Sequence, residues 1–95
     1  YYMAKQAILK IHGKVQGVFY RDYTQEKAEK LGLTGWVKNM SDGTVEMCLQ
    51  GKEDAINKMI EWCHEGSPPS DVEKIDIQLK DLPSGEALDF FEKRY

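Results

Sequence analysis

The fold is decided by residues 6–32, which read QAILKIHGKVQGVFYRDYTQEKAEKLG. Apolar residues recur at every second position over Gln6–His12, a spacing that predicts a β-strand. The glycines of Gly13–Val18 predict a loop. A helical stripe then predicts an α-helix over Arg21–Leu31 that stops at Gly32. Strand, loop and helix together form the first half of a crossover between two parallel strands.

The rest of the chain supplies the second half of the crossover and then repeats the pattern. Strands are predicted over Thr34–Met40, Thr44–Gln50 and Val72–Lys80, a second helix from Gly51 to about Glu65, and a short edge strand within Leu88–Tyr95. Right-handed crossovers make the first two strands parallel and place the third between them. The order predicts an α+β fold, a ferredoxin-like βαββαβ sandwich. Its antiparallel sheet has four strands plus the short C-terminal edge strand, with both helices on one face.

Composition favours one small globular domain. The chain has 95 residues, of which 41% are hydrophobic and 31% are charged. We expect the domain to span residues 3–95, with Tyr1 and Tyr2, which precede Met3, foreign to the native chain. Sixteen acidic against thirteen basic residues give a net charge of −3, which disfavours a nucleic-acid partner. With no long apolar run and no signal-peptide pattern, we expect a cytoplasmic monomer with no membrane partner.

The two cysteines, Cys48 and Cys63, are too few and too far apart for a disulfide framework or a zinc cluster. We expect two reduced thiols, with Cys63 in the core and Cys48 on the other side of the sheet. No metal site and no cofactor are predicted.

The loop over Val15–Tyr20 runs into a helix N-terminus, an arrangement that suits an anion. Successive backbone N–H groups and the positive end of the helix dipole attract phosphate, and Arg21 can hold two phosphate oxygens. The crossover brings Asn39, at the end of the second predicted strand, to the same sheet edge as Arg21. Alone this signal is weak, since many glycine turns before helices bind nothing.

The loop also indicates a chemistry by what it lacks. Residues 15–20 contain no Cys, Ser, Thr, Asp or His, so they offer no nucleophile for a covalent phosphoenzyme. Asp22 and Asp42 make no convincing pair of metal ligands. Such a site suits a substrate with a good leaving group, such as the carboxylate of an acyl phosphate, attacked directly by water. The carboxamide of Asn39 can orient that water by hydrogen bonding.

Two motifs resemble those of the acylphosphatase family. Residues 13–21, GKVQGVFYR, resemble the signature G-x-V-Q-G-V-x-[FY]-R, and residues 35–46, GWVKNMSDGTVE, resemble G-W-V-x-N-x-x-D-G-x-V-E. The resemblance implies the ferredoxin-like fold and metal-free hydrolysis of an acyl phosphate to a carboxylate and inorganic phosphate. It implies that Arg21 binds phosphate and Asn39 orients water. The implied phosphate-binding loop consists of Val15, Gln16, Gly17, Val18, Phe19, Tyr20 and Arg21.

The tail departs from the family pattern F-x-I-R-[RY], because Lys93 stands where an apolar residue belongs. This predicts poorer packing of the last strand. His12 lies near the loop but outside the motif, and we expect it to be structural or solvated rather than a general base.

Two other functions stay open. One is an acylphosphatase-like module that handles carbamoyl phosphate within a larger maturation system. The other is a non-catalytic ferredoxin-like binding module. A nucleic-acid module of this fold would need aromatic and basic residues in its third strand, and residues 44–50 contain neither.

Overall fold

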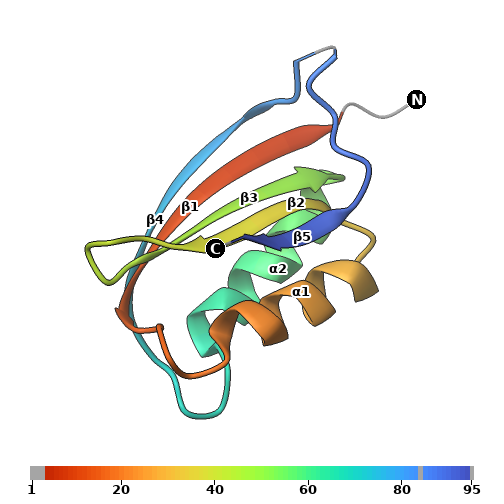
Figure 1. Ribbon diagram of the computed structural model, residues 1–95. Helices are drawn as coiled ribbons and strands as arrows, with labels where there is room; N and C mark the ends of the chain where they lie inside the picture. Colours follow the sequence, from red (N-terminus) through yellow and green to blue (C-terminus); the bar gives the residue numbers. More distant parts are fainter. Residues whose placement is uncertain (1–3, 84, 95) are drawn as a thin grey trace.

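Residues 4–83 and 85–94 are described by a computed structural model of the protein. The elements are β1 (Lys5–Lys14), α1 (Tyr20–Lys30), β2 (Thr34–Asn39), β3 (Val45–Gly51), α2 (Glu53–Glu65), β4 (Asp71–Asp81) and β5 (Phe91–Arg94). The five strands form one sheet in the order β4-β1-β3-β2-β5, and both helices cover the same face (Figure 1). Neighbouring strands are antiparallel except β2 and β5, which are parallel. The predicted ferredoxin-like sandwich is therefore confirmed.

Several element boundaries differ from the predicted ones by a few residues, because strand pairing continues past the local signals. β1 continues through Gly13 to Lys14, since a register shift after His12 lets these residues pair with β4. Gly51 does not open α2 but ends β3, where it pairs with Lys5. Residues 1–2, which we expect to be foreign to the native chain, and residue 95 of the predicted edge strand lie outside the described residues.

The core lies between the sheet and the two helices. Side chains along β1 and β3 point alternately to the two faces of the sheet, so every second one points toward the helices. On α2, the residues that pack against them recur at helical spacing. The fully buried side chains include Ala7, Leu9, Ile11, Val45, Met47, Leu49, Ile56, Met59 and Cys63. Both cysteines are buried free thiols. No helix within residues 4–83 and 85–94 is long and apolar enough to cross a membrane.

Strand β5 closes the sheet beside β2, despite Lys93. Phe91 is buried, and Lys93 lies opposite Val37 in the parallel register. The Lys93 ammonium lies 2.5 Å from the carboxylate of Asp22 in α1. An ion pair between β5 and α1 thus stands where the family pattern has an apolar side chain.

Candidate active site

The predicted site residues meet in one cavity at the end of the sheet. The cavity has a volume of about 270 Å³ and is lined by Val15, Gly17, Phe19, Tyr20, Arg21, Asp22 and Asn39. The structure therefore brings together the loop, Arg21 and Asn39, which lie on three successive parts of the crossover. Gln16 and Val18, the other two predicted loop residues, do not line this cavity.

Apolar anchors hold the loop between β1 and α1. Val15 and Val18 are buried, and so is Tyr20, the first residue of α1. The Tyr20 hydroxyl donates to the carbonyl of Cys63 in α2 at 2.8 Å. From beyond α2, the Ser67 hydroxyl donates to the carbonyl of Val18 at 2.8 Å. The loop backbone is thus fixed from the side of the core.

The amide N–H groups of residues 16–20 donate no hydrogen bond to any atom of the described chain. They lie at the N-terminus of α1, where no side chain caps the helix. Helix N-terminal amides and the positive end of the helix dipole together favour a bound anion. The electrostatics of the cavity therefore suit a phosphate group.

Two loop residues have left-handed backbone conformations. Gly17 has φ 72°, which costs a glycine little. Phe19 has φ 62° and is the only non-glycine residue with a positive φ in the described chain. That conformation costs an L-residue about 1–2 kcal/mol. Neither the φ of Phe19 nor the exposure of its ring follows from the sequence pattern, and no local signal for either was visible.

Arg21 is oriented from the C-terminal strand. Its Nη1 donates to the carbonyl of Arg94 in β5 at 2.8 Å. The guanidinium of Arg94 lies 5.0 Å from the ring centre of Trp36 in β2, and its Nε bonds to the carboxylate of Glu92. The end of β5, which the motifs did not implicate, thus helps to place the arginine that lines the cavity.

Glu86 and Leu88, which lie on the way to β5, are held to the sheet by the buried side chain of Gln50. The amide nitrogen of Gln50 donates to the side chain of Gln6 at 2.8 Å and to the carbonyl of Glu86 at 3.1 Å. Its oxygen accepts from the backbone N–H of Leu88 at 2.8 Å. These bonds fix the route of the chain into β5, and with it the carbonyl that contacts Arg21.

Asn39 is the last residue of β2 and pairs with Val45 of β3. Its carboxamide oxygen is buried and accepts no hydrogen bond from the described residues. The side chain is therefore not engaged as a turn-forming residue, the alternative role for an asparagine at this point of the sequence. The described residues therefore leave the hydrogen-bonding capacity of this carboxamide oxygen unused, at a residue that lines the cavity.

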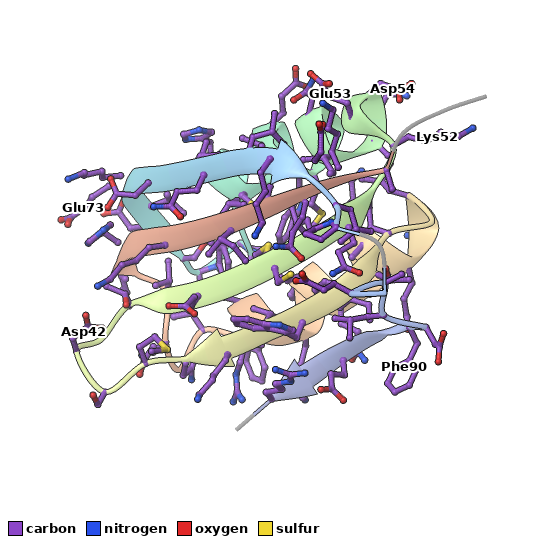
Figure 2. The ribbon with its side chains drawn as sticks, turned by 90° about the horizontal axis from the view of Figure 1, so that it is seen from above. Asp42, Lys52, Glu53, Asp54, Glu73 and Phe90 are labelled. Carbon is purple, nitrogen blue, oxygen red and sulfur yellow. The ribbon has the colours of Figure 1, made fainter. Side chains whose placement is uncertain are left out.

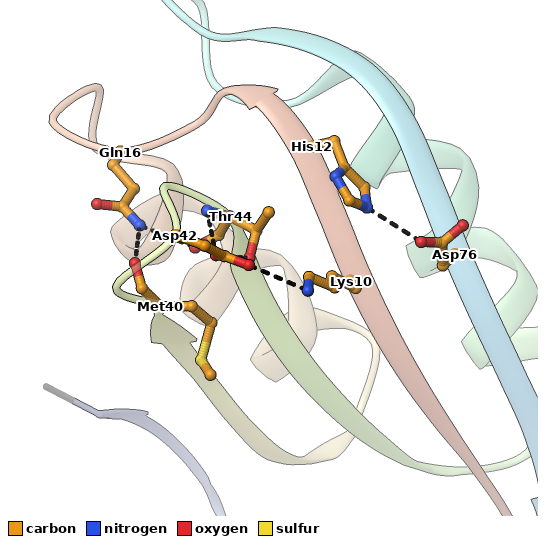
Figure 3. A network of polar contacts seen from close by, with 7 residues as sticks. All are labelled: Lys10, His12, Gln16, Met40, Asp42, Thr44 and Asp76. Carbon is orange, nitrogen blue, oxygen red and sulfur yellow. Dashed lines mark hydrogen bonds and ion pairs between the residues drawn. The ribbon is translucent and has the colours of Figure 1, made fainter.

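Gln16 joins the loop to the turn that follows Asn39 (Figure 3). Its amide nitrogen donates to the carbonyls of Met40 at 2.7 Å and Thr44 at 2.8 Å. The side chain of a predicted loop residue therefore fixes the distance between the loop and the β2–β3 turn. Sequence reasoning included Gln16 only for its backbone and missed this bridge.

Asp42 stiffens the same turn. Its carboxylate accepts from the backbone N–H and the hydroxyl of Thr44, at 3.0 and 2.6 Å, and lies 3.0 Å from the Lys10 ammonium (Figure 3). These hydrogen bonds, with the smaller contribution of Lys10, hold the pKa of Asp42 well below its usual range. Asp42 is therefore a structural member of the turn.

His12 lies 3.0 Å from the carboxylate of Asp76 in β4, and it does not line the cavity (Figure 3). The pair lowers the pKa of Asp76, chiefly through the hydrogen bond from His12. His12 therefore contacts a carboxylate outside the cavity, and its structural role stays a prediction. Asp22, the acidic residue at the cavity, has its charge offset by the contact with Lys93.

Comparison with known proteins identifies the family. A family model described as acylphosphatase matches residues 7–92. The chain belongs to the acylphosphatase family. An acylphosphatase of Rubrobacter xylanophilus is 43% identical over 81 residues, which are 85% of this chain and 74% of the relative. An acylphosphatase of Geobacter sulfurreducens is 39% identical over 93 residues, which are 98% of this chain and 100% of the relative.

Solved structures agree with the family. The crystal structure of acylphosphatase from Bacillus subtilis matches with a TM-score of 0.90 at 36% identity, over 96% of this chain and 99% of the other. A structure of full-length HypF, bound to phosphate and nucleotide, matches with a TM-score of 0.80 at 27% identity. It covers 97% of this chain but only 12% of HypF. These matches confirm the predicted family, the predicted fold and the prediction that the chain is an acylphosphatase enzyme.

Proposed function

We propose that this acylphosphatase hydrolyses the carboxyl–phosphate bond of small acyl phosphates by direct attack of water, without a metal ion. The observation that carries the proposal is the shared cavity. It gathers an arginine, an asparagine and loop residues whose amide N–H groups bond nothing else in the described chain. Residues 15–20 contain no Cys, Ser, Thr, Asp or His, and Asp22, the carboxylate in the lining, is paired with Lys93. Such a site can bind and orient, so it suits a substrate that already has a good leaving group.

The loop amides and Arg21 hold the phosphoryl oxygens. The amides of residues 16–20 lie at the N-terminus of α1, which favours an anion, and the guanidinium adds charge and a second pair of donors. The carbonyl of Arg94 keeps the guanidinium in place. The charge on the phosphoryl oxygens is therefore met by donors that are in position before the reaction, which lowers the cost of reaching the transition state.

Asn39 orients the attacking water. The water oxygen forms a bond to phosphorus while the bond from phosphorus to the carboxylate oxygen breaks, in line with it. The carboxylate leaves as an anion because the pKa of its acid is about 4, so no general acid is needed. The proton of the water leaves to a phosphate oxygen or to solvent. The products are a carboxylate and inorganic phosphate.

Hydrolysis of benzoyl phosphate in the presence of EDTA tests the proposal. The wild-type protein is expected to exceed the spontaneous rate, and Arg21→Ala to raise both KM and the inhibition constant of inorganic phosphate. Asn39→Ala is expected to lower kcat about 10²–10³-fold with less effect on KM. Asn57→Ala, an exposed asparagine on α2, is the matched control and should behave like the wild type. A wild-type rate equal to the spontaneous one would refute the proposal.

A second candidate is a module that handles carbamoyl phosphate within a larger protein. The match to a short part of the much longer HypF chain supports the occurrence of this domain within a larger protein. Comparison of kcat/KM for carbamoyl phosphate and benzoyl phosphate separates the two. A large preference for carbamoyl phosphate would favour the module over the general acylphosphatase.

A further inference from the structure

Phe19 combines a strained backbone conformation with a solvent-exposed side chain. It adopts a left-handed backbone conformation, with φ 62° and ψ 20°, that disfavours any side chain. Its side chain is also 67% exposed to solvent, so the ring gains little from burial. Strained backbone conformations cluster at sites that meet a ligand. Phe19 lines the cavity that holds Arg21 and Asn39.

The chain contains a close comparison for this residue. Phe90 is 64% exposed, but it lines a different pocket, together with Gly35, Glu92 and Arg94, and it projects from the edge of the molecule just before β5 (Figure 2). Tyr23, one turn further along α1, is 43% exposed and does not line the cavity either. Among the aromatic side chains of residues 4–83 and 85–94, Phe19 is therefore the one that is both largely exposed and at the candidate site.

We propose that the ring of Phe19 contacts the acyl group of the substrate, so that flat apolar acyl groups, aromatic ones above all, are preferred. This inference rests on the proposed function, because it assigns the acyl end of the same substrate. The phosphoryl group lies on the loop amides, and a single bridging oxygen joins it to the acyl carbon. The acyl substituent therefore lies within a few ångströms of the loop, in which Phe19 directly precedes the first residue of α1.

The backbone at Phe19 is held rigidly, which favours a contact over a chance exposure. Its carbonyl accepts from the backbone N–H of Tyr23 at 3.1 Å in the first turn of α1. Val18 and Tyr20, the residues on either side, are both buried. With both neighbours anchored in the core, the direction of the Phe19 Cα–Cβ bond is fixed toward the outside of the loop. A preorganised ring costs less entropy on contact with a ligand than a mobile one.

The direction of attack agrees with this placement. In-line displacement puts the leaving carboxylate on the far side of phosphorus from the attacking water. Asn39, which orients the water in the proposed mechanism, reaches the cavity from the end of β2, whereas Phe19 reaches it from the start of α1. The proposal therefore assigns the attacking water to Asn39 and the leaving acyl group to Phe19, on two different elements that line one cavity.

Substrate comparison with Phe19→Ala is the decisive experiment. The kcat/KM ratio of benzoyl phosphate to acetyl phosphate is measured for both proteins, since these substrates share the phosphate and differ in the acyl group. The variant is expected to lower the ratio about three- to tenfold, the range that an aromatic contact contributes to an equilibrium constant. Any loss of rate with acetyl phosphate, which shares the phosphoryl group bound by the loop, should be smaller than the loss with benzoyl phosphate. Phe90→Ala is the matched control and should leave the ratio unchanged.

Phe19→Gly separates the ring from the backbone. Glycine adopts a positive φ readily, so this variant removes the ring together with the backbone cost. It should show the same lowered ratio as Phe19→Ala, and it serves as the test if the alanine variant fails to fold. An unchanged ratio in these variants, or an equal loss with both substrates, would overturn the inference.

Stable analogues make the test independent of turnover. The inhibition constants of phenylphosphonate and methylphosphonate should differ less in Phe19→Ala than in the wild type. If the wild-type protein hydrolyses neither substrate above the spontaneous rate, the proposed function fails. If it hydrolyses both and the variants keep the wild-type ratio, only the role of Phe19 fails, and its exposed ring is then a candidate contact for another protein.

Discussion

Replacing Gln16 with leucine tests whether the side-chain bridge between the loop and the β2–β3 turn serves catalysis. Gln16→Leu keeps a side chain of similar size but removes both donated hydrogen bonds, to the carbonyls of Met40 and Thr44. The bridge ties the amides of the phosphate-binding loop to the turn directly after Asn39. Its loss should let these two parts of the proposed site move relative to each other.

The structure sets the size of the effect on stability. Each carbonyl keeps a second donor, because that of Met40 also accepts from Gly43 at 3.2 Å and that of Thr44 from Met40 at 2.8 Å. Neither is left unpaired, so the loss is the net value of two hydrogen bonds. We expect the free energy of unfolding to fall by about 1–2 kcal/mol. For a domain of this size the melting temperature should fall by about 5–15 °C.

The effect on the reaction should be larger. A misplacement of about 1 Å between catalytic groups can cost up to ~10²-fold in rate. We therefore expect kcat for benzoyl phosphate to fall about tenfold or more, measured well below the melting temperature, while KM changes less than about threefold. Gln25→Leu is the matched control, because Gln25 donates to the carbonyl of Phe91 at 3.3 Å away from the cavity. A stability loss with unchanged kcat would refute the positioning role, and unchanged stability would refute the bridge itself.

Three further changes test the fold around the site. Tyr20→Phe removes the hydroxyl that bonds the Cys63 carbonyl, and it should lower the free energy of unfolding by about 1–3 kcal/mol in urea titrations. Gly35→Ala should prevent stable folding, seen as loss of cooperative thermal unfolding, because the new Cβ would lie 1.9 Å from the carbonyl oxygen of Cys48 at a residue with φ 135°. Asp42→Asn should be less stable than the wild type above about pH 4. That difference should shrink progressively as the pH falls from the ordinary carboxyl pKa toward the depressed pKa of the folded state, because protonation then removes the charge that the fold stabilises.

The layered fold could be predicted from the sequence because each element buries one face. Apolar residues therefore alternate in β1 and β3 and recur at helical spacing in α2, and this pattern predicts the elements. The right-handed crossover rule then predicts the strand order. The ends of the elements could not be predicted. Whether β1 stops before or after Gly13 depends on the bulge and on the partners that β4 offers, and neither is encoded locally.

The candidate site, like the fold, could be predicted from the sequence only in part. The meeting of Arg21 and Asn39 could be predicted, because strand and helix lengths in a crossover nearly cancel. The bridge from Gln16 could not, since it bonds carbonyls 24 and 28 residues further along the chain. Nor could the carbonyl of Arg94 that orients Arg21, which lies 73 residues away. Contacts at such separation leave no periodic signal in the sequence.

The side chains and the backbone of the loop have different roles. The proposed chemistry belongs to the backbone amides, and these must face outward together in a conformation that costs about 1–2 kcal/mol at Phe19. Burial of Val15 and Val18 contributes up to about 1.5–3 kcal/mol each, which is enough to offset that cost. The hydrogen bonds from Ser67 and Gln16 add directional restraint. An apolar loop can therefore carry out polar chemistry, because its side chains hold the backbone in place from the core side while the amides remain available to the anion.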